Sequence, residues 1–535
     1  MTVLTRIPFA ARRMWDHDSI QFALGVERYD LAAHHPHPPG YPLYIALLKL
    51  LAACGVDSLH GMVALSILAE GIGAACLVLL VARLVAEGRT EESGLAAGLF
   101  AAALYVFNPI LWFYGELPLV YAVEGGMTVA VAYAALAMGD GPRVFLGACA
   151  LFAVVGGVRQ STLLLLAPLV LYGAWRAFRR ERLSWRLAAG GAGLFAALFL
   201  AWFVPLCALA GGYGAYRRIS AENFATLLPQ TSILYGAGWG ALAHNLEVLT
   251  KWALQGVFPG AVALALLWAV TPEEILPGLR LLRSRAGLLA AWALPPIAFF
   301  ALFHVTKAGY TLVHLPALLA ALAVAAAPAL AFDRPPDRPP NRPLSRLRAA
   351  LAIGAAVTVG AGLFLGSAER RPEQGRPWAI VRQEWNRGAI ATYERDLDDM
   401  LATVRQYPPA TTVLVAVELG GTGAAGAEGF LYSWHRHLQW YLPQYLVVMA
   451  VPEEDFALVA RGHRPLQKEL AQVALPAATA RLLFVLSGPT GDRLPLGPGA
   501  VATHSHTFYL TVVPFAGRRT VGPLLLTAEP RRHAA

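Results

Sequence analysis

The sequence is poor in charged residues and has very little cysteine. Only 14% of its 535 residues are Asp, Glu, Lys or Arg, whereas a soluble domain carries roughly 25%. Hydrophobic residues make up 57% of the chain, which excludes an ordinary soluble enzyme and predicts a protein that crosses a bilayer several times. The four cysteines all lie in apolar stretches, which excludes a disulfide framework and a zinc site built from cysteines.

The chain is nevertheless basic, with 43 Lys and Arg against 34 Asp and Glu. A formal net charge of +9 could indicate a nucleic-acid partner. Membrane proteins, however, accumulate Lys and Arg in their cytoplasmic loops, and the basic residues here gather in such loops. We therefore expect a lipid bilayer and no nucleic acid among the partners.

Long apolar stretches follow one another through the first two thirds of the chain. A membrane span needs about 20 apolar residues. Ten stretches meet or approach that length, and the fourth is the shortest: 60–85, 94–113, 117–138, 143–158, 160–177, 187–211, 247–270, 286–303, 310–331 and 347–366. The sequence therefore predicts a mainly α polytopic bundle of about 10–11 spans.

Clusters of arginine orient this bundle. They occupy residues 176–182, the segment with Arg280, Arg283 and Arg285, and the proline-rich link with Arg334, Arg338, Arg342 and Arg346. The positive-inside rule places all three in the cytoplasm, and ten alternating spans satisfy that placement. The regions then expected outside are the residues before 60, the turns at 115–117, 159 and 304–310, the loop 212–246, and the tail after 366.

The stretch HHPHPPGYPLY, residues 34–44, precedes an apolar segment too short to be a span. Residues 41–56 would cover only about 24 Å as a helix, and a full span there would reverse the side of every later loop. We expect a helix at the outer membrane surface, entered through a rigid proline corner. A chain that starts outside should follow a span, so we also expect a first span to be missing before Met1.

The tail after residue 366 differs from the rest of the chain in its sequence pattern. Short strand-like runs alternate with polar helical stretches such as 385–406, which predicts a small α/β domain. The expected strands are 412–417, 445–451, 481–486 and 507–513. The expected division is a membrane domain, 1–366, and an extracytoplasmic α/β domain, 367–535.

Residues able to do chemistry gather on the predicted outer face. Acidic and cationic groups together at the mouth of a helical bundle suit acid–base work on an anionic substrate carried by a lipid. Each of these residues, taken alone, would be interpreted as a solvated loop residue. The full set of chemically able residues on this face is Asp16, Asp18, Asp30, His34, His35, His37, Glu116, Glu124, Arg159, His304 and Lys307.

The segment WDHDSIQFALGVERYDLAAHHPHPPGYPLY resembles the first external loop of the GT-C membrane glycosyltransferases. It is most similar to bacterial relatives of the dolichyl-phosphate-mannose protein mannosyltransferases, glycosyltransferase family 39. The resemblance continues in YGELPLVYAVEGG, GGVRQSTLLLLAPL and HVTKAGYTLVHLPAL, and so covers roughly the first 330 residues.

The resemblance implies an inverting hexosyltransferase of the bacterial plasma (inner) membrane. A polyprenyl-phosphate sugar would be the donor, and a protein, glycolipid or polysaccharide hydroxyl the acceptor. Matching the pattern makes Asp18 the expected base and Asp16 the runner-up, with a helix N-cap as the alternative role for Asp18. Glu116 or Glu124 would position the acceptor or a cation.

The same resemblance supplies the expected substrate contacts. Arg159 and Lys307 are candidates for the lipid phosphate, with anchoring to lipid headgroups as the equally weighted alternative. The remaining expected contacts are His35, His37, Tyr41 and Tyr310. No organic cofactor is expected, and the His-Pro-His pair leaves a divalent cation open.

Three other patterns offer alternatives. The GTGAAG at 421–426 has the form of a dinucleotide-binding turn, although an extracytoplasmic position disfavours that function. Glu70 lies inside a span, where a charge would suit a transporter or a lipid flippase, but it stands alone there, which disfavours that function. The aromatic segment 431–445 places Trp434, His437 and Tyr441 on one helix face, for gripping a carbohydrate or, more commonly, for core packing.

Overall fold

The chain forms two compact units. The first consists of Met1–Ala11 and Pro38–Ala389, and the second of Arg12–His37 and Ile390–Ala535. The loop 12–37 thus belongs to the same unit as the C-terminal part. The predicted boundary after residue 366 adjoins residues outside the described part and stays a prediction. The computed structural model describes residues 1–86, 91–331, 342–366, 384–417, 434–450, 456–487, 501–504, 508–521 and 524–529.

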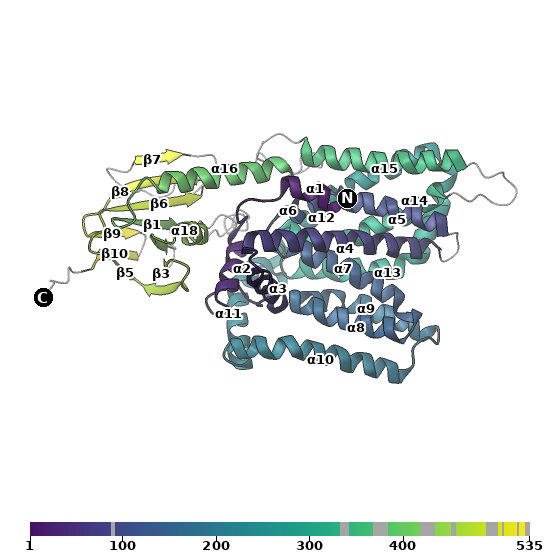
Figure 1. Ribbon diagram of the computed structural model, residues 1–535, viewed down its shortest axis with the longest axis horizontal. Coiled ribbons are helices and arrows are strands. Elements are labelled where there is room, and N and C mark those ends of the chain that lie inside the picture. The colour runs from purple at the N-terminus through teal and green to yellow at the C-terminus, as the bar shows by residue number, and fades with distance from the viewer. Residues whose placement is uncertain are drawn as a thin grey trace. The chain divides into compact units, whose positions relative to one another are not determined.

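The first unit is a bundle whose long helices run side by side (Figure 1). Within it α4 packs against α5 and α7, and α13 packs against α9 and α14. Its α-helices are α1 (Thr2–Arg6), α3 (Pro42–Ala53), α4 (Ser58–Ala86), α5 (Glu91–Val106), α6 (Pro109–Glu116), α7 (Tyr121–Ala137), α8 (Pro142–Val158), α9 (Ser161–Arg179), α10 (Trp185–Leu209), α11 (Tyr213–Thr231), α12 (Gly238–Val270), α13 (Ile275–Leu302), α14 (Leu315–Leu330) and α15 (Arg342–Leu365). Turns of 3-10 helix are η1 (Ile7–Phe9), η2 (Met138–Asp140), η3 (Ile233–Tyr235), η4 (Pro272–Glu274) and η5 (Ala308–Val313).

The predicted spans correspond to these helices. In the described part of the chain, seven helices are long and apolar enough to cross a membrane: α4, α7, α9, α10, α12, α13 and α15. The bent pair α5–α6 adds an eighth, and α8 and α14 are shorter apolar helices that coincide with the remaining two expected spans. The prediction of a polytopic helical bundle is therefore confirmed.

Three details differ from the expected loops. Arg280, Arg283 and Arg285 were predicted in a loop, but they lie in the first turns of α13, which begins at Ile275. The predicted loop 212–246 contains helix α11 and the start of α12. Residues 41–56 contain α3, whose 12 residues agree with a helix shorter than a span. The missed helical turns are polar, so their hydropathy resembles that of a loop.

A proline and an asparagine shape the bent pair. The axis turns by 59° between α5 and α6. Pro109 cannot continue α5 because it lacks an N–H, but it suits the first turn of a new helix. Asn108 caps that helix by accepting from the backbone N–H groups of Ile110 and Leu111. Its own amide donates to the carbonyl of Gly256 in α12 at 2.6 Å, which fixes the bend against a neighbouring helix.

The second unit contains two sheets. Seven strands follow the order β4-β3-β2-β1-β6-β8-β7, and three follow the order β5-β10-β9. Strand β1 lies parallel to β2 and β6, and the other neighbours in the larger sheet are antiparallel. The strands are β1 (Thr412–Val417), β2 (Leu446–Ala450), β3 (Phe456–Arg461), β4 (Gln467–Leu470), β5 (Gln472–Leu475), β6 (Arg481–Ser487), β7 (Val501–His504), β8 (Phe508–Pro514), β9 (Arg518–Val521) and β10 (Leu524–Ala528). The helices are α2 (His17–Glu27), α16 (Arg387–Val404) and α18 (His435–Tyr441), with the first turn of α16 in the first unit.

The larger sheet is buried on both faces, which explains its apolar central strands. Alternate residues of a strand point to opposite faces. Leu414 and Ala416 of β1 pack in a core with α16 and α18. Val413, Val415 and Val417 pack on the other face, in a core shared with the three-stranded sheet.

The prediction of an α/β domain is therefore confirmed. The four expected strands correspond to β1, β2, β6 and β8, and the expected helix 385–406 corresponds to α16. Trp434 lies in the core beside α16, which supports the packing interpretation of the aromatic segment. The glycine-rich stretch 421–426 lies outside the described residues.

Candidate functional site

A buried ion pair joins three helices of the bundle. The Nη1 of Arg159 lies 2.6 Å from Oε2 of Glu124, and the hydroxyl of Thr162 donates to Oε1 of Glu124 at 2.5 Å. Glu124 and Thr162 lie in the first turns of α7 and α9, and Arg159 caps α8. A carboxylate in a first turn also interacts favourably with the helix dipole. Because the pair is buried, removing either partner would leave an uncompensated charge.

Two tyrosine rings flank the guanidinium of Arg159. Its Cζ lies 5.2 Å from the centroid of Tyr121 and 4.8 Å from that of Tyr310. Burial by itself would lower the pKa of Arg159, but Glu124 and the nearby tyrosines, Tyr41 among them, raise that pKa well above its usual value. Three of the predicted site residues, Glu124, Tyr310 and Tyr41, are thus grouped around the permanent cation of a fourth, Arg159.

A second cation lies in the turn after α13. Lys307 immediately precedes η5 and is buried to a similar degree as Arg159. The pKa of His304 is lowered to about 4 by burial and then by the charges of Arg159 and Lys307. His304 is therefore neutral at pH 7. Arg159 and Lys307 thus place two positive charges near this histidine.

The proline corner of the opening motif, Pro38 and Pro39, is hydrogen-bonded to the residue that follows Arg159. The Nε2 of Gln160 donates to the carbonyl of Pro39 at 3.1 Å. Tyr41 adopts a left-handed backbone with a φ of 49°, which costs a non-glycine residue roughly 1–2 kcal/mol. Such strain persists where the surrounding structure over-determines it, often at functional sites. Pro42 then starts α3, so the corner holds Tyr41 where it acts on the charge of Arg159.

The two predicted bases lie in the loop 12–37 of the second unit and have different surroundings. Asp16 is the N-cap of α2, since its Oδ1 accepts from the backbone N–H groups of Asp18 and Ser19. Asp18 therefore does not cap this helix. Its Oδ1 lies 3.1 Å from Nε2 of His17 and 3.8 Å from Nδ1 of His37, and the side chain is 12% exposed.

The histidines of the opening motif are also in the second unit. The ring of His37 faces Asp18 and packs on Phe22 with centroids 5.4 Å apart. His35 is fully buried, and its backbone pairs with that of Asp30. Burial and the charge of Arg436 lower the pKa of His35 to about 3. His35 and His37, which were predicted together, thus meet different groups.

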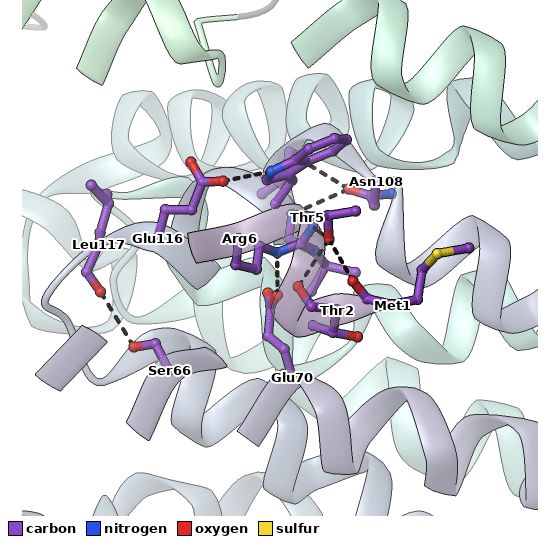
Figure 2. Close-up of polar contacts among 12 residues, drawn as sticks. Met1, Thr2, Thr5, Arg6, Ser66, Glu70, Asn108, Glu116 and Leu117 are labelled. Carbon is purple, nitrogen blue, oxygen red and sulfur yellow. Dashed lines mark hydrogen bonds and ion pairs between the residues drawn. The ribbon is translucent and has the colours of Figure 1, made fainter. Parts of the chain in front are cut away.

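Glu116 lies apart from the Arg159 group, at the end of α6. Its Oε1 accepts from Nε1 of Trp112 at 2.5 Å, and its side chain is fully buried. Figure 2 shows Glu116 beside an ion pair between Arg6 of α1 and Glu70 of α4. The Nε of Arg6 lies 2.8 Å from Oε2 of Glu70. Of the two glutamates, only Glu124 accompanies the candidate phosphate-binding cations.

The interpretation of Glu70 as a solitary charge was wrong. Its partner Arg6 is 64 residues away in the sequence, and both side chains are fully buried. The guanidinium of Arg6 also lies 5.1 Å from the ring centroid of Trp112. Sequence reasoning likewise overlooked Thr162 and Tyr121. Tyr121 lies three residues before Glu124 on α7, and that spacing puts both on one helix face.

No group of three or more His, Cys, Asp or Glu side chains is arranged to hold a metal ion in the described ranges. The His-Pro-His pair, which left a divalent cation open, places His35 among buried groups and His37 beside Asp18.

Comparisons with known proteins agree with this architecture. Residues 29–184 match the family model of the TMEM260 N-terminal domain, described as protein O-mannosyl-transferase. That match covers the proline corner, Glu124, Arg159 and Thr162. Comparison with curated protein sequences found no significant match.

Two crystal structures of ArnT from Cupriavidus metallidurans have a similar fold. The structure bound to undecaprenyl phosphate is 12% identical, covers 96% of each chain and has a TM-score of 0.52. The apo structure is 13% identical, covers 95% of this chain and 96% of ArnT, and has the same TM-score. The protein thus has the fold of a GT-C glycosyltransferase, as its sequence predicts.

Proposed function

We propose that this protein transfers a sugar from a polyprenyl-phosphate donor to an acceptor hydroxyl. The reaction is an inverting single displacement at the extracytoplasmic face of a bacterial plasma membrane. The acceptor hydroxyl belongs to a protein, a glycolipid or a polysaccharide.

The observation that carries this proposal is the presence of two buried cations, Arg159 and Lys307, whose charges act on the same histidine, His304. The lipid phosphate departs with increased negative charge, so fixed cations stabilise the transition state. Arg159 is held by Glu124 and two tyrosines, and so it needs little reorganisation when the phosphate forms. Lys307 supplies the second cation, and charges act more strongly in a site that excludes water.

The proposed base is Asp18. Its carboxylate takes the proton of the acceptor hydroxyl, the hydroxyl oxygen bonds to the anomeric carbon, and the carbon–oxygen bond to the lipid phosphate breaks. The phosphate leaves with the electron pair of that bond. Asp18 is favoured over Asp16 because an oxygen of Asp16 is already bound to two backbone N–H groups of α2.

Two comparisons support the donor and the reaction. The similar fold of ArnT was crystallised with undecaprenyl phosphate, and the matching family model is described as a protein O-mannosyl-transferase. A polyprenyl-phosphate mannose is therefore the first donor to test, against exported proteins and glycolipids as acceptors.

Substitution of the base tests the proposal. Asp18→Asn keeps the shape of the side chain and should lower the transfer rate by about 10²–10⁴-fold, measured with a labelled polyprenyl-phosphate sugar. Asp57→Asn is the matched control, because Asp57 lies at the exposed start of α4, where asparagine caps equally well. Near-normal transfer by Asp18→Asn with an inactive Asp16→Asn would move the base to Asp16.

A polytopic transporter or lipid flippase is the alternative function. In the sequence its support was a charged residue, Glu70, inside a span, and in the structure that residue is paired with Arg6. Uptake by sealed vesicles without sugar transfer would establish the alternative.

The proposed sidedness has its own test. A compartment-specific reporter fused after Gly366 should be active only outside the cytoplasm, and one fused at Arg182 only inside. If both fusions were active in the same compartment, that result would contradict the extracytoplasmic placement of the α/β domain.

A further inference from the structure

The loop that carries the proposed base is built into the C-terminal unit. Residues 12–37 and 390–535 form one compact unit, and α18 packs against α2. Helix α2 contains Asp18 in its first turn and is capped by Asp16. The position of Asp18 therefore depends on a domain encoded more than 370 residues later.

Tyrosines of the C-terminal unit hold the start of the loop. The hydroxyl of Tyr441 accepts from the backbone N–H of Met14 at 2.8 Å, and the hydroxyl of Tyr393 donates to the carbonyl of Met14 at 3.2 Å. The Tyr393 oxygen also lies 2.6 Å from Nε2 of His437. A phenol has one proton, so Nε2 of His437 donates to Tyr393. The ring of Trp15 packs on Tyr393 with centroids 4.4 Å apart.

A buried arginine of α18 holds the end of the loop. The Nη1 of Arg436 donates to Nε2 of His35, and its Nη2 donates to the carbonyl of Ala33, both at 3.2 Å. Arg436 is itself oriented by Gln439, whose side chain donates to the carbonyl of Arg464. The donated bond requires an unprotonated Nε2 on His35, which therefore stays neutral.

The buried contacts between the C-terminal unit and the loop 12–37 differ from an exposed contact between the same two parts of the chain. His463 lies 3.0 Å from Glu27 at the end of α2, but the Glu27 side chain is 45% exposed. Exposed pairs of this kind contribute little. Buried bonds to a charged donor contribute more, and a charge left without them is costly. The hydrogen bonds of Tyr441 and Tyr393 with Met14, and those of Arg436 with Ala33 and His35, are thus the contacts that determine where the loop lies.

We infer that the C-terminal unit positions the base: Arg436, Tyr393 and Tyr441 are positioning residues that act through the loop on Asp18. This inference rests on the proposed function for its kinetic consequence. His35 has a supporting role here, as the acceptor of the Arg436 bond.

The first experiment is independent of activity. Hydrogen exchange of the purified full chain should show faster exchange of residues 14–35 in Arg436→Gln than in the wild type, and unchanged exchange in Glu27→Gln. Tyr441→Phe, which removes only one oxygen, should accelerate exchange near Met14. Exchange unchanged in both Arg436→Gln and Tyr441→Phe would overturn the inference, whatever the protein transfers.

The second experiment measures transfer. Arg436→Gln should lower kcat by about 10–100-fold and leave the donor KM within about twofold, because an effect confined to the base acts on the chemical step. Arg436→Lys, which keeps the cation, should restore part of kcat. The double variant Arg436→Gln/Asp18→Asn should be no slower than Asp18→Asn, because residues that act as a unit are not additive. A further loss in the double variant equal to that of Arg436→Gln alone would overturn the inference.

Discussion

The bundle contains two buried arginine–glutamate pairs that are built alike and surrounded differently. In each, the arginine bonds a glutamate and lies near an aromatic ring: Arg159 with Glu124 and two tyrosines, Arg6 with Glu70 and Trp112. The neighbours of Arg159 are Lys307 and the neutral His304. The neighbour of Arg6 is a second carboxyl group, that of Glu116, as Figure 2 shows.

The charged neighbours of each arginine distinguish their roles. A second cation, Lys307, acts on the same histidine as Arg159, so an anion there would meet two positive charges. The charged neighbours of Arg6 that Figure 2 labels, Glu70 and Glu116, are carboxyl groups, which do not attract a phosphate. Ala11 of the same N-terminal segment donates its backbone N–H to the carbonyl of Glu116 at 3.0 Å. The Arg6 group therefore ties that segment to α4 and α6, whereas the Arg159 group remains the candidate for binding.

The largest expected effect is the loss of sugar transfer when Arg159 is replaced. Arg159→Gln should reduce kcat/KM for the polyprenyl-phosphate sugar by about 10²–10³-fold, because a fixed donor to the leaving group is lost. The measurement is initial-rate kinetics on the folded fraction. Arg143→Gln is the matched control, since Arg143 is exposed in the first turn of the same helix α8. Full activity in Arg159→Gln would place the phosphate elsewhere.

Removing Arg6 should act on stability alone. Arg6→Met leaves Glu70 buried without its partner and should cost about 3–5 kcal/mol of unfolding free energy. The double variant Arg6→Met/Glu70→Gln should recover most of that loss, because no unpaired charge remains. Unfolding in detergent and donor KM are the two measurements. A raised donor KM in the double variant would contradict the contrast between the pairs.

The helices and strands that the sequence predicted correctly are those with a recognisable pattern of neighbouring residues. Apolar length identified the spans, and short apolar runs identified strands such as β1 and β6, which lie next to each other inside the larger sheet. Strands β4, β5 and β9 were missed because they are four residues each and partly exposed, so they lack an apolar run.

The candidate site was predicted only as a set of residue types on one face. Nothing local pairs Arg6 with Glu70, or joins the loop 12–37 to Arg436, because these contacts span 64 and about 400 residues. One local signal was available: the spacing from Asp16 to Ser19 is that of a helix cap. It would have separated the capping aspartate from Asp18 at the outset.

Lys307 should have a smaller effect than Arg159. Lys307→Gln removes the second cation but leaves the Arg159–Glu124 pair intact, so the donor KM should rise about tenfold, which corresponds to about 1.4 kcal/mol. The rise should shrink at high salt, which screens the contribution of the charge in the wild type. Lys49→Gln, on the exposed side of α3, is the control. An unchanged KM would remove Lys307 from the phosphate site.

The smallest effect concerns His304 and tests whether the charges of Arg159 and Lys307 act on it together. Burial, Arg159 and Lys307 lower the pKa of His304 to about 4 in the folded protein, against an unfolded value near 6.5. Between these values the unfolded chain binds a proton that the folded chain excludes. Stability is therefore retained above pH 6.5 and falls as the pH decreases toward 4, by at most about 1.4 kcal/mol per pH unit from this residue.

His304→Gln should accordingly show a shallower loss of unfolding free energy between pH 6.5 and 4, and match the pH dependence of the wild type above pH 7. His34 and His35 titrate in both proteins, so they cancel in the difference. In a Lys307→Gln background one of the charges that lower the pKa is gone, and the contribution of His304 should diminish. A difference of the same size in both backgrounds would mean that Lys307 does not act on His304 and does not belong to the group around Arg159.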